Sequence, residues 1–125
     1  MSLAKAIIDY LEDEEVAVFD EDVFIGSFPA DTRDCLVVVD TGGFKPKKDT
    51  TSSPTIQVKC RDKSYKKGKE RLEEVKDLLH DKNNYQLGNI YVYMSEAMQE
   101  VGWIGQDEKG NQLCSVNFHF RVKYY

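Results

Sequence analysis

An alternating pattern covers residues 114–124, which read Cys114-Ser115-Val116-Asn117-Phe118-His119-Phe120-Arg121-Val122-Lys123-Tyr124. Apolar side chains occupy the even positions, and polar or charged side chains occupy the odd ones. Because successive side chains of a strand point to opposite faces of a sheet, this period of two predicts a long strand with one buried face. Val116, Phe118 and Phe120 are its expected core residues.

Five shorter apolar runs predict further strands, at residues 16–19, 23–28, 35–39, 55–61 and 90–94. The run at 55–61 alternates, which is typical of a half-buried strand. The runs at 35–39 and 90–94 are apolar at nearly every position, so we expect both of their faces to be covered. Residues 97–112 are rich in glycine and polar residues and read as a connection, in which Trp103 is exposed.

Two stretches with helical spacing predict helices over residues 3–13 and 64–80, capped by Ser2 and Ser64. Tyr65 falls on the apolar stripe of the second helix and is expected in the core. The order is then α-β-β-β-β-α-β-β. It predicts an α+β fold in which the two helices pack on one face of a mostly antiparallel sheet.

The length of 125 residues predicts a single domain over residues 1–125. Residues 40–54 interrupt it with glycine, proline, lysine and hydroxyl residues and no periodicity. Loops of this length are uncommon in compact domains and usually serve a function. We therefore expect a long, mobile loop at 40–54, with Phe44 as its one large apolar residue.

No catalytic or metal-binding motif stands out. The two histidines, His80 and His119, have no acidic or cysteine partner at a recognised spacing, and Cys35, Cys60 and Cys114 are far apart. Their separation and the missing signal peptide predict reduced thiols. No apolar run reaches the roughly 18 residues of a membrane span. The expectation is a protein without enzyme activity, cofactor or metal, and without a membrane partner.

Charge is distributed unevenly along the chain. The net charge of −5 argues against sequence-independent nucleic-acid binding, and we expect no sequence-specific nucleic-acid partner. Acidic residues gather at 12–15 and 20–22, and basic residues gather at 45–48 and 59–69. A solvated surface and a protein contact remain the two interpretations of this pattern. The predicted interface consists of Phe44, Lys45, Lys47, Lys48, Glu12, Glu14, Glu15 and Trp103.

Several segments together resemble one family of proteins. They are Ile25-Gly26-Ser27-Phe28-Pro29, Val37 to Gly43, Pro54-Thr55-Ile56-Gln57-Val58, Ser64-Tyr65 to Leu78-Leu79-His80, and Ser115-Val116-Asn117-Phe118 to Tyr124-Tyr125. In this order they resemble the minor capsid proteins of siphophages and prophages. In size and element order the chain is also similar to the tail terminator, or tail completion, proteins of long-tailed phages.

This resemblance implies a structural virion protein at the head–tail joint, assembled in the bacterial cytoplasm. Tail terminators form a ring, here expected to be a hexamer, that caps the tail tube and docks it to the head connector. The resemblance implies no cofactor and no catalysis, and phage DNA would pass through the ring. The alternative is a small non-catalytic protein-binding module that acts as a monomer or dimer. Oligomeric state separates the two.

Overall fold

The computed structural model describes residues 2–45 and 51–124. The helices in these ranges are α1 (Leu3–Asp13) and α2 (Tyr65–Leu79). The strands are β1 (Val23–Ile25), β2 (Cys35–Gly43), β3 (Thr51–Ser52), β4 (Pro54–Asp62), β5 (Lys82–Leu87), β6 (Ile90–Ala97), β7 (Gly102–Gln106) and β8 (Gln112–Tyr124). The predicted α+β fold is confirmed, and the structure adds β5 and β7 to the strands predicted after the second helix.

Strand β8 is the central strand of the sheet. One of its edges pairs with β4 and β3, and the other edge pairs with β7 and β6. Beyond these, β2 and β1 follow β4, and β5 follows β6, so the main path is β1-β2-β4-β8-β6-β5. All named strand pairs are antiparallel except β1 with β2. The period of two that predicts β8 therefore marks the strand through which the two halves of the sheet are joined.

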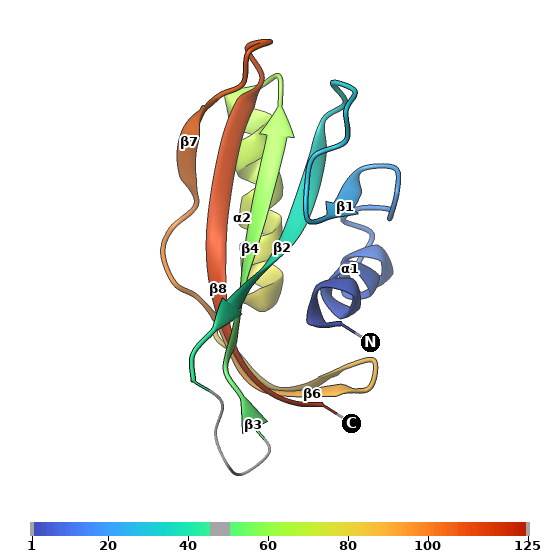
Figure 1. The fold of residues 1–125 in the computed structure, drawn as a ribbon, viewed down its shortest axis with the longest axis vertical. Helices are drawn as coiled ribbons and strands as arrows, with labels where there is room; N and C mark the ends of the chain where they lie inside the picture. The colour runs from blue at the N-terminus through green and yellow to red at the C-terminus, as the bar shows by residue number, and fades with distance from the viewer. Residues whose placement is uncertain (1, 46–50, 125) are drawn as a thin grey trace.

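The core lies between one face of this sheet and the two helices. Phe118, Phe120 and Val116 of β8 are fully buried there. Helix α2 lies along β4 and β8, and α1 contacts β1, β2 and β5 (Figure 1). Gly68 of α2 approaches β4 so closely that a Cβ at this position would lie 3.1 Å from the Cβ of Asp62. A larger residue at this position would therefore push α2 away from β4.

Both helices begin as the sequence predicts. The Ser2 hydroxyl accepts a hydrogen bond from the Lys5 backbone N–H, and the Ser64 hydroxyl accepts one from that of Lys67. These side chains satisfy N–H groups that the first helical turn leaves without a partner. Helix α1 stops at Asp13, and Glu15 takes a left-handed backbone conformation with φ of 60°.

The strand predicted at 16–19 is wrong. This segment makes only an isolated bridge between Phe19 and Val23, because a tight turn folds it back onto the start of β1. In that turn the Asp22 carboxylate accepts a hydrogen bond from the Val18 N–H. The strand predicted at 23–28 is shorter and ends at Ile25, since Gly26 has a φ of 87°.

The loop predicted at 40–54 has different boundaries. Strand β2 continues to Gly43, where it pairs with Pro54, and β3 pairs with β8 at Thr51 and Ser52. A side chain at Gly43 would place a Cβ 2.4 Å from the Ser53 carbonyl oxygen, so the hairpin closes only with glycine there. Residues 46–50 lie outside the described ranges, and the predicted mobility of the loop stays a prediction.

Replacing Phe118 with alanine should destabilise the fold strongly. Its ring is fully buried in the centre of the core, so truncation removes apolar contacts and leaves a cavity. We expect the free energy of unfolding in urea to fall by about 3–5 kcal/mol. Asn117→Ala, one residue away on the opposite, half-buried face, is the matched control and should have a much smaller effect. Equal losses in both variants would contradict this assignment of the two faces.

Candidate functional site

The predicted interface residues fall in three separate places. Phe44 and Lys45 follow β2, Glu12, Glu14 and Glu15 lie at the end of α1, and Trp103 lies on β7. Lys47 and Lys48 are outside the described residues. The structure therefore does not bring the predicted residues together on one surface, and each place has to be considered by itself.

Phe44 packs against His119, which lies within the central strand β8. Its ring lies edge-on to the ring of His119, with 4.9 Å between centroids, and is still 57% exposed. His119 Nδ1 lies 3.6 Å from a carboxylate oxygen of Glu96, whereas its Nε2 is buried and has no hydrogen-bond partner among the described residues. Phe44 is thus an exposed apolar residue whose ring is held against His119 of β8.

The end of α1 and the turn after it form a strongly acidic surface. Glu14, Glu15, Asp20 and Glu21 are exposed, and in the described part of the chain their carboxylates make no ion pair. Val18 lies among them with 46% of its surface exposed. We call these five residues the acidic surface.

Strand β7 is an exposed strand that sequence analysis missed. Trp103 and Ile104 are 52% and 53% exposed, and the Trp103 indole N–H donates a hydrogen bond to the Gln112 side chain of β8. Gly102 and Gly105 flank the two apolar residues, and Gly105 lies at a register shift. Because glycines and polar residues interrupt the alternation, the strand has no clear period. The consecutive apolar pair Trp103-Ile104 was the one feature of the sequence that could have indicated a strand here.

The basic residues at 59–69 do not form one cluster. Lys59 and Arg61 extend over the ring of Phe28, whereas Lys63, Lys66 and Lys67 are exposed near the start of α2. The prediction that Tyr65 is in the core is wrong, since its side chain is 47% exposed. Tyr65 lies in the first turn of the helix, beyond the part of the stripe that Leu72, Val75 and Leu79 bury against the sheet.

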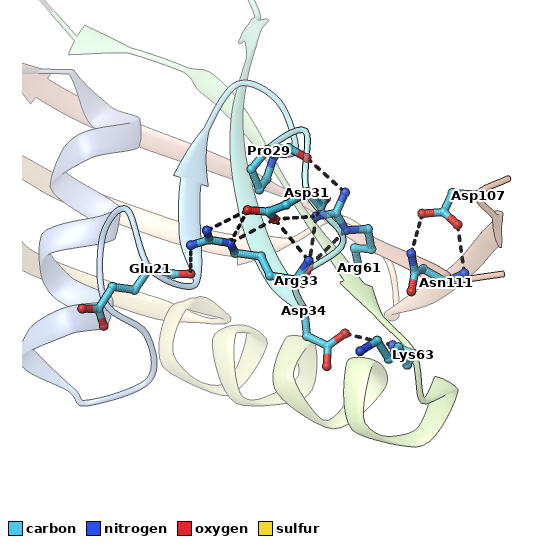
Figure 2. A network of polar contacts seen from close by, with 9 residues as sticks. All are labelled: Glu21, Pro29, Asp31, Arg33, Asp34, Arg61, Lys63, Asp107 and Asn111. Atoms are coloured by element: carbon cyan, nitrogen blue, oxygen red, sulfur yellow. Dashed lines mark hydrogen bonds and ion pairs between the residues drawn. The ribbon is translucent and has the colours of Figure 1, made fainter. Parts of the chain in front are cut away.

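Arg61 holds a long loop against the end of the sheet (Figure 2). Its side chain is only 8% exposed, and its guanidinium donates hydrogen bonds to the carbonyls of Pro29, Asp31 and Arg33. Arg33 in turn forms a double hydrogen bond with the Asp31 carboxylate and donates to the Glu21 carbonyl. The Arg33 guanidinium therefore lowers the pKa of Asp31 below its ordinary value.

A hollow of about 230 Å³ lies beside this loop, between residues 30–32, Arg61 and the turn at 107–109. That turn is closed by Asp107, whose carboxylate accepts hydrogen bonds from the Asn111 side chain and backbone and from the Lys109 N–H. The hydrogen bonds of Asn111 are the main reason that the pKa of Asp107 is lowered. The loop and the turn together form a polar, hydrogen-bonded end of the molecule.

A sequence model of the family described as "Bacteriophage tail terminator protein" matches residues 10–124. The chain belongs to this family. The predicted resemblance to tail terminators is therefore confirmed, and the match includes every described strand, the whole of α2 and the C-terminal end of α1. A search of curated proteins found no match.

Family membership makes this terminator protein a structural protein of the phage tail. It indicates contact with tail and head components and a place in the virion. A structural role of this kind suggests a protein without enzyme activity. The minor-capsid label stays a prediction.

The described residues of the terminator protein show little that is suited to chemistry. They contain no group of three or more histidine, cysteine or acidic residues that could hold a metal ion. Neither α1 nor α2 is long and apolar enough to cross a membrane. The three cysteines are free and buried, and burial raises the pKa of each thiol, that of Cys60 to about 12. They are therefore poor nucleophiles at neutral pH.

Arg61→Lys should loosen the loop that the guanidinium holds. One ammonium group cannot reproduce the fork of donors that reaches three carbonyls. We expect the free energy of unfolding to fall by about 1–3 kcal/mol, and amide hydrogen exchange of residues 29–33 to become faster. Arg33→Lys is the matched control, because Arg33 contacts the same loop from an exposed position. If Arg33→Lys has the larger effect, Arg61 is not the main anchor.

Proposed function

We propose that this protein is the tail terminator that closes the tail tube as a ring, a hexamer, and offers the docking surface for the head connector. The family match over residues 10–124 carries the proposal. A ring requires a heterologous contact, in which two different surfaces of one subunit meet their counterparts on its neighbours. Large exposed apolar residues at several separate places, among them Phe44, Tyr65 and Trp103, are consistent with more than one contact surface.

In this proposal the protein works by shape and contact. A ring seated on the last layer of the tube leaves no free site for another tube subunit, so tube growth stops. The opposite face of the ring is then available to the head. The ring is open at its centre, so phage DNA would pass through it, and assembly takes place in the bacterial cytoplasm before the particle is released.

The mass of the purified protein in solution tests the ring. Over a range of concentrations, light scattering coupled to size exclusion should show growth from the 14.4 kDa subunit to one closed species, a hexamer, without larger polymers. In a phage that lacks the gene, tubes should exceed their normal length and heads should remain unjoined until the wild-type protein is supplied. A protein that stays monomeric or dimeric, with or without tubes, would support the alternative of a small binding module.

Phe44 is proposed as an apolar anchor of the contact with a neighbour or with the tube, together with Lys45, Lys47 and Lys48. Because the phenyl ring of Phe44 is largely exposed in the subunit, Phe44→Ala should change the free energy of unfolding by about 1 kcal/mol or less. The same variant should support far fewer joined particles in the complementation assay. Normal particle yield with Phe44→Ala would remove this residue from the interface.

A further inference from the structure

Strand β7 is an edge strand whose outer side is open. Among the described strands it pairs with β8 alone, so a row of its backbone N–H and C=O groups points away from the sheet. Figure 1 shows β7 at one margin of the molecule, beyond β8. Exposed edges are normally blunted by lysine, proline or a covering segment. Strand β7 has no charged residue and no proline, and it carries the exposed Trp103 and Ile104 instead.

Gly102 leaves space on β7 that the subunit does not fill. Apart from its chain neighbours, a Cβ at this position would meet no described atom within 4 Å, and the backbone has no positive φ there. Any residue would therefore fit within the subunit, although glycine weakens a strand. Glycine in a strand often marks a place where another backbone or a ligand approaches closely. A group from outside the subunit would account for the missing side chain.

The residues of β7 divide between the two faces of the sheet. Trp103 lies opposite Cys114, whose side chain is in the core, so Trp103 is on the helix-bearing face. Its indole N–H donates to the Gln112 side chain, which holds the ring in place. Gly102 lies opposite Ser115, one position further along β8, and so belongs to the face without helices. An added strand would thus meet an aromatic ring on one face and open space on the other.

Helix α2 adds a basic and an aromatic residue to the helix-bearing side of this edge. Burial raises the pKa of the Cys114 thiol, and the Lys69 ammonium acts in the opposite direction, which places Lys69 near the residue that faces Trp103. Lys69 forms no ion pair with another described residue. Tyr65, one turn earlier on the same flank, is exposed. We define the β7 edge surface as Tyr65, Lys69, Gly102, Trp103 and Ile104.

The other margins of the described sheet are poorly suited to pair with β7 of a neighbouring copy. Strand β5, beyond β6, begins with Lys82 and is irregular at Asn84, where φ is 54°. Strand β1 has three residues, and Val23, the first of them, is already bridged to Phe19. Neither strand offers the regular edge that a sheet continued from one copy to the next requires.

Pairing of β7 with β7 of a second copy is opposed by charge. In an antiparallel pair the start of one strand lies beside the end of the other. Glu100 lies two residues before β7, and Asp107 and Glu108 follow it directly. The pair would therefore bring carboxylates of both copies together at each end, and like charges on adjacent strands are destabilising. The strand that covers β7 thus comes from a different protein.

We propose that the β7 edge surface binds an extended segment of the tail tube subunit, which pairs with β7 as an added strand. Main-chain hydrogen bonds supply the affinity in this mode of binding, and side-chain contacts supply the specificity. A large apolar side chain of the segment covers Gly102, as large side chains do for glycines at sheet edges. On the other face an apolar side chain packs on Trp103, one of the residue types that most often dominate interface energies, and an acidic side chain meets Lys69.

The tail tube subunit is the assigned occupant because family membership makes this protein a component of the tail. The inference rests on the proposed capping of the tube and names the edge that seats the ring on it. Ring closure then uses other surfaces of the subunit. A change on β7 should consequently affect binding to the tube and leave the oligomeric state unchanged.

A charge on the open edge tests the docking. The probe is the tail tube purified from phage that lacks the gene, and cosedimentation measures binding. Ile104→Lys adds the residue that natural edges use for protection, so binding should become weaker by about tenfold or more. The melting temperature and the ring should not change, because Ile104 is exposed. The matched control is Ile25→Lys, the same change at an exposed residue of β1, which should bind like the wild type.

Gly102→Val tests the open space. Valine favours strands and would meet no described atom there, so the melting temperature should be unchanged or higher. Binding to tubes should still become weaker, by about threefold or more, because the new side chain occupies the space of the partner. Asn83→Val adds the same side chain to the other edge strand, β5, and should leave binding unchanged. A stable Gly102→Val variant with normal binding would show that nothing approaches this glycine.

Hydrogen exchange tests strand pairing itself. Amides of residues 102–106 that point away from β8 should exchange rapidly in the free ring. With tubes bound their exchange should become slower by about tenfold or more, because an added strand supplies acceptors for these N–H groups. Contact through side chains alone would not supply these acceptors. Unchanged exchange in β7 despite binding would overturn the added strand.

The outcomes separate the inference from the proposed function. If rings form and cap tubes while Ile104→Lys and Gly102→Val bind like the wild type, the named edge is wrong and the proposed function stands. If Ile104→Lys prevents ring formation, β7 is a contact between copies and the assignment to the tube is wrong. If the variants bind tubes and fail only to join heads, a head protein is the occupant and the assignment is again wrong. A wild type that does not bind tubes overturns both proposals.

Discussion

The pairing of β8 along both of its edges is the constraint on which the rest of the structure depends. Among the described strands no other contacts four partners, and the two halves of the described sheet share no hydrogen-bonded strand pair except through β8. Its alternation also separates the two faces. Because every second side chain enters the core, a shift of register by one residue would expose the phenylalanines and bury His119 and Arg121.

The different chemistry of the two sheet margins follows from this arrangement. Since β8 is central, the strands added on either side extend the sheet toward two margins, and the margins acquire different chemistry. One begins with an acidic turn, and the other ends in a short strand with a tryptophan. Arg61 stiffens the end of the sheet between them by holding the loop that leads from β1 to β2. A ring needs two different surfaces on one subunit, and the two margins of this sheet differ in chemistry.

The sequence predicts those helices and strands whose apolar residues recur at a clear helical or strand spacing. The boundaries of α1, the extent of β8, the fold class and the buried cysteines could all be read from spacing alone. Strands β5 and β7 could not, because their polar and glycine-rich residues satisfy backbone hydrogen bonds without burying an apolar stripe. Tyr65 has the right helical position for the core, but no periodicity shows where the sheet beneath a helix ends. The acidic and basic segments were recognised, whereas the contact between Arg71 of α2 and Asp22 of the acidic turn depends on the tertiary fold, which local sequence does not contain.

The position of β8 in the chain has a consequence for biosynthesis. It follows every other described element, so the ribosome completes β4, β6 and both helices before it makes the strand that joins them. Until β8 emerges, β4 and β6 each present an unpaired edge and an incomplete apolar face. Folding must then be concluded after most of the chain is made, through contacts between residues distant in sequence, which is intrinsically slow. The nascent protein is consequently most prone to aggregate in that interval, and a host chaperone that shields strand edges would raise the yield of subunits competent for assembly.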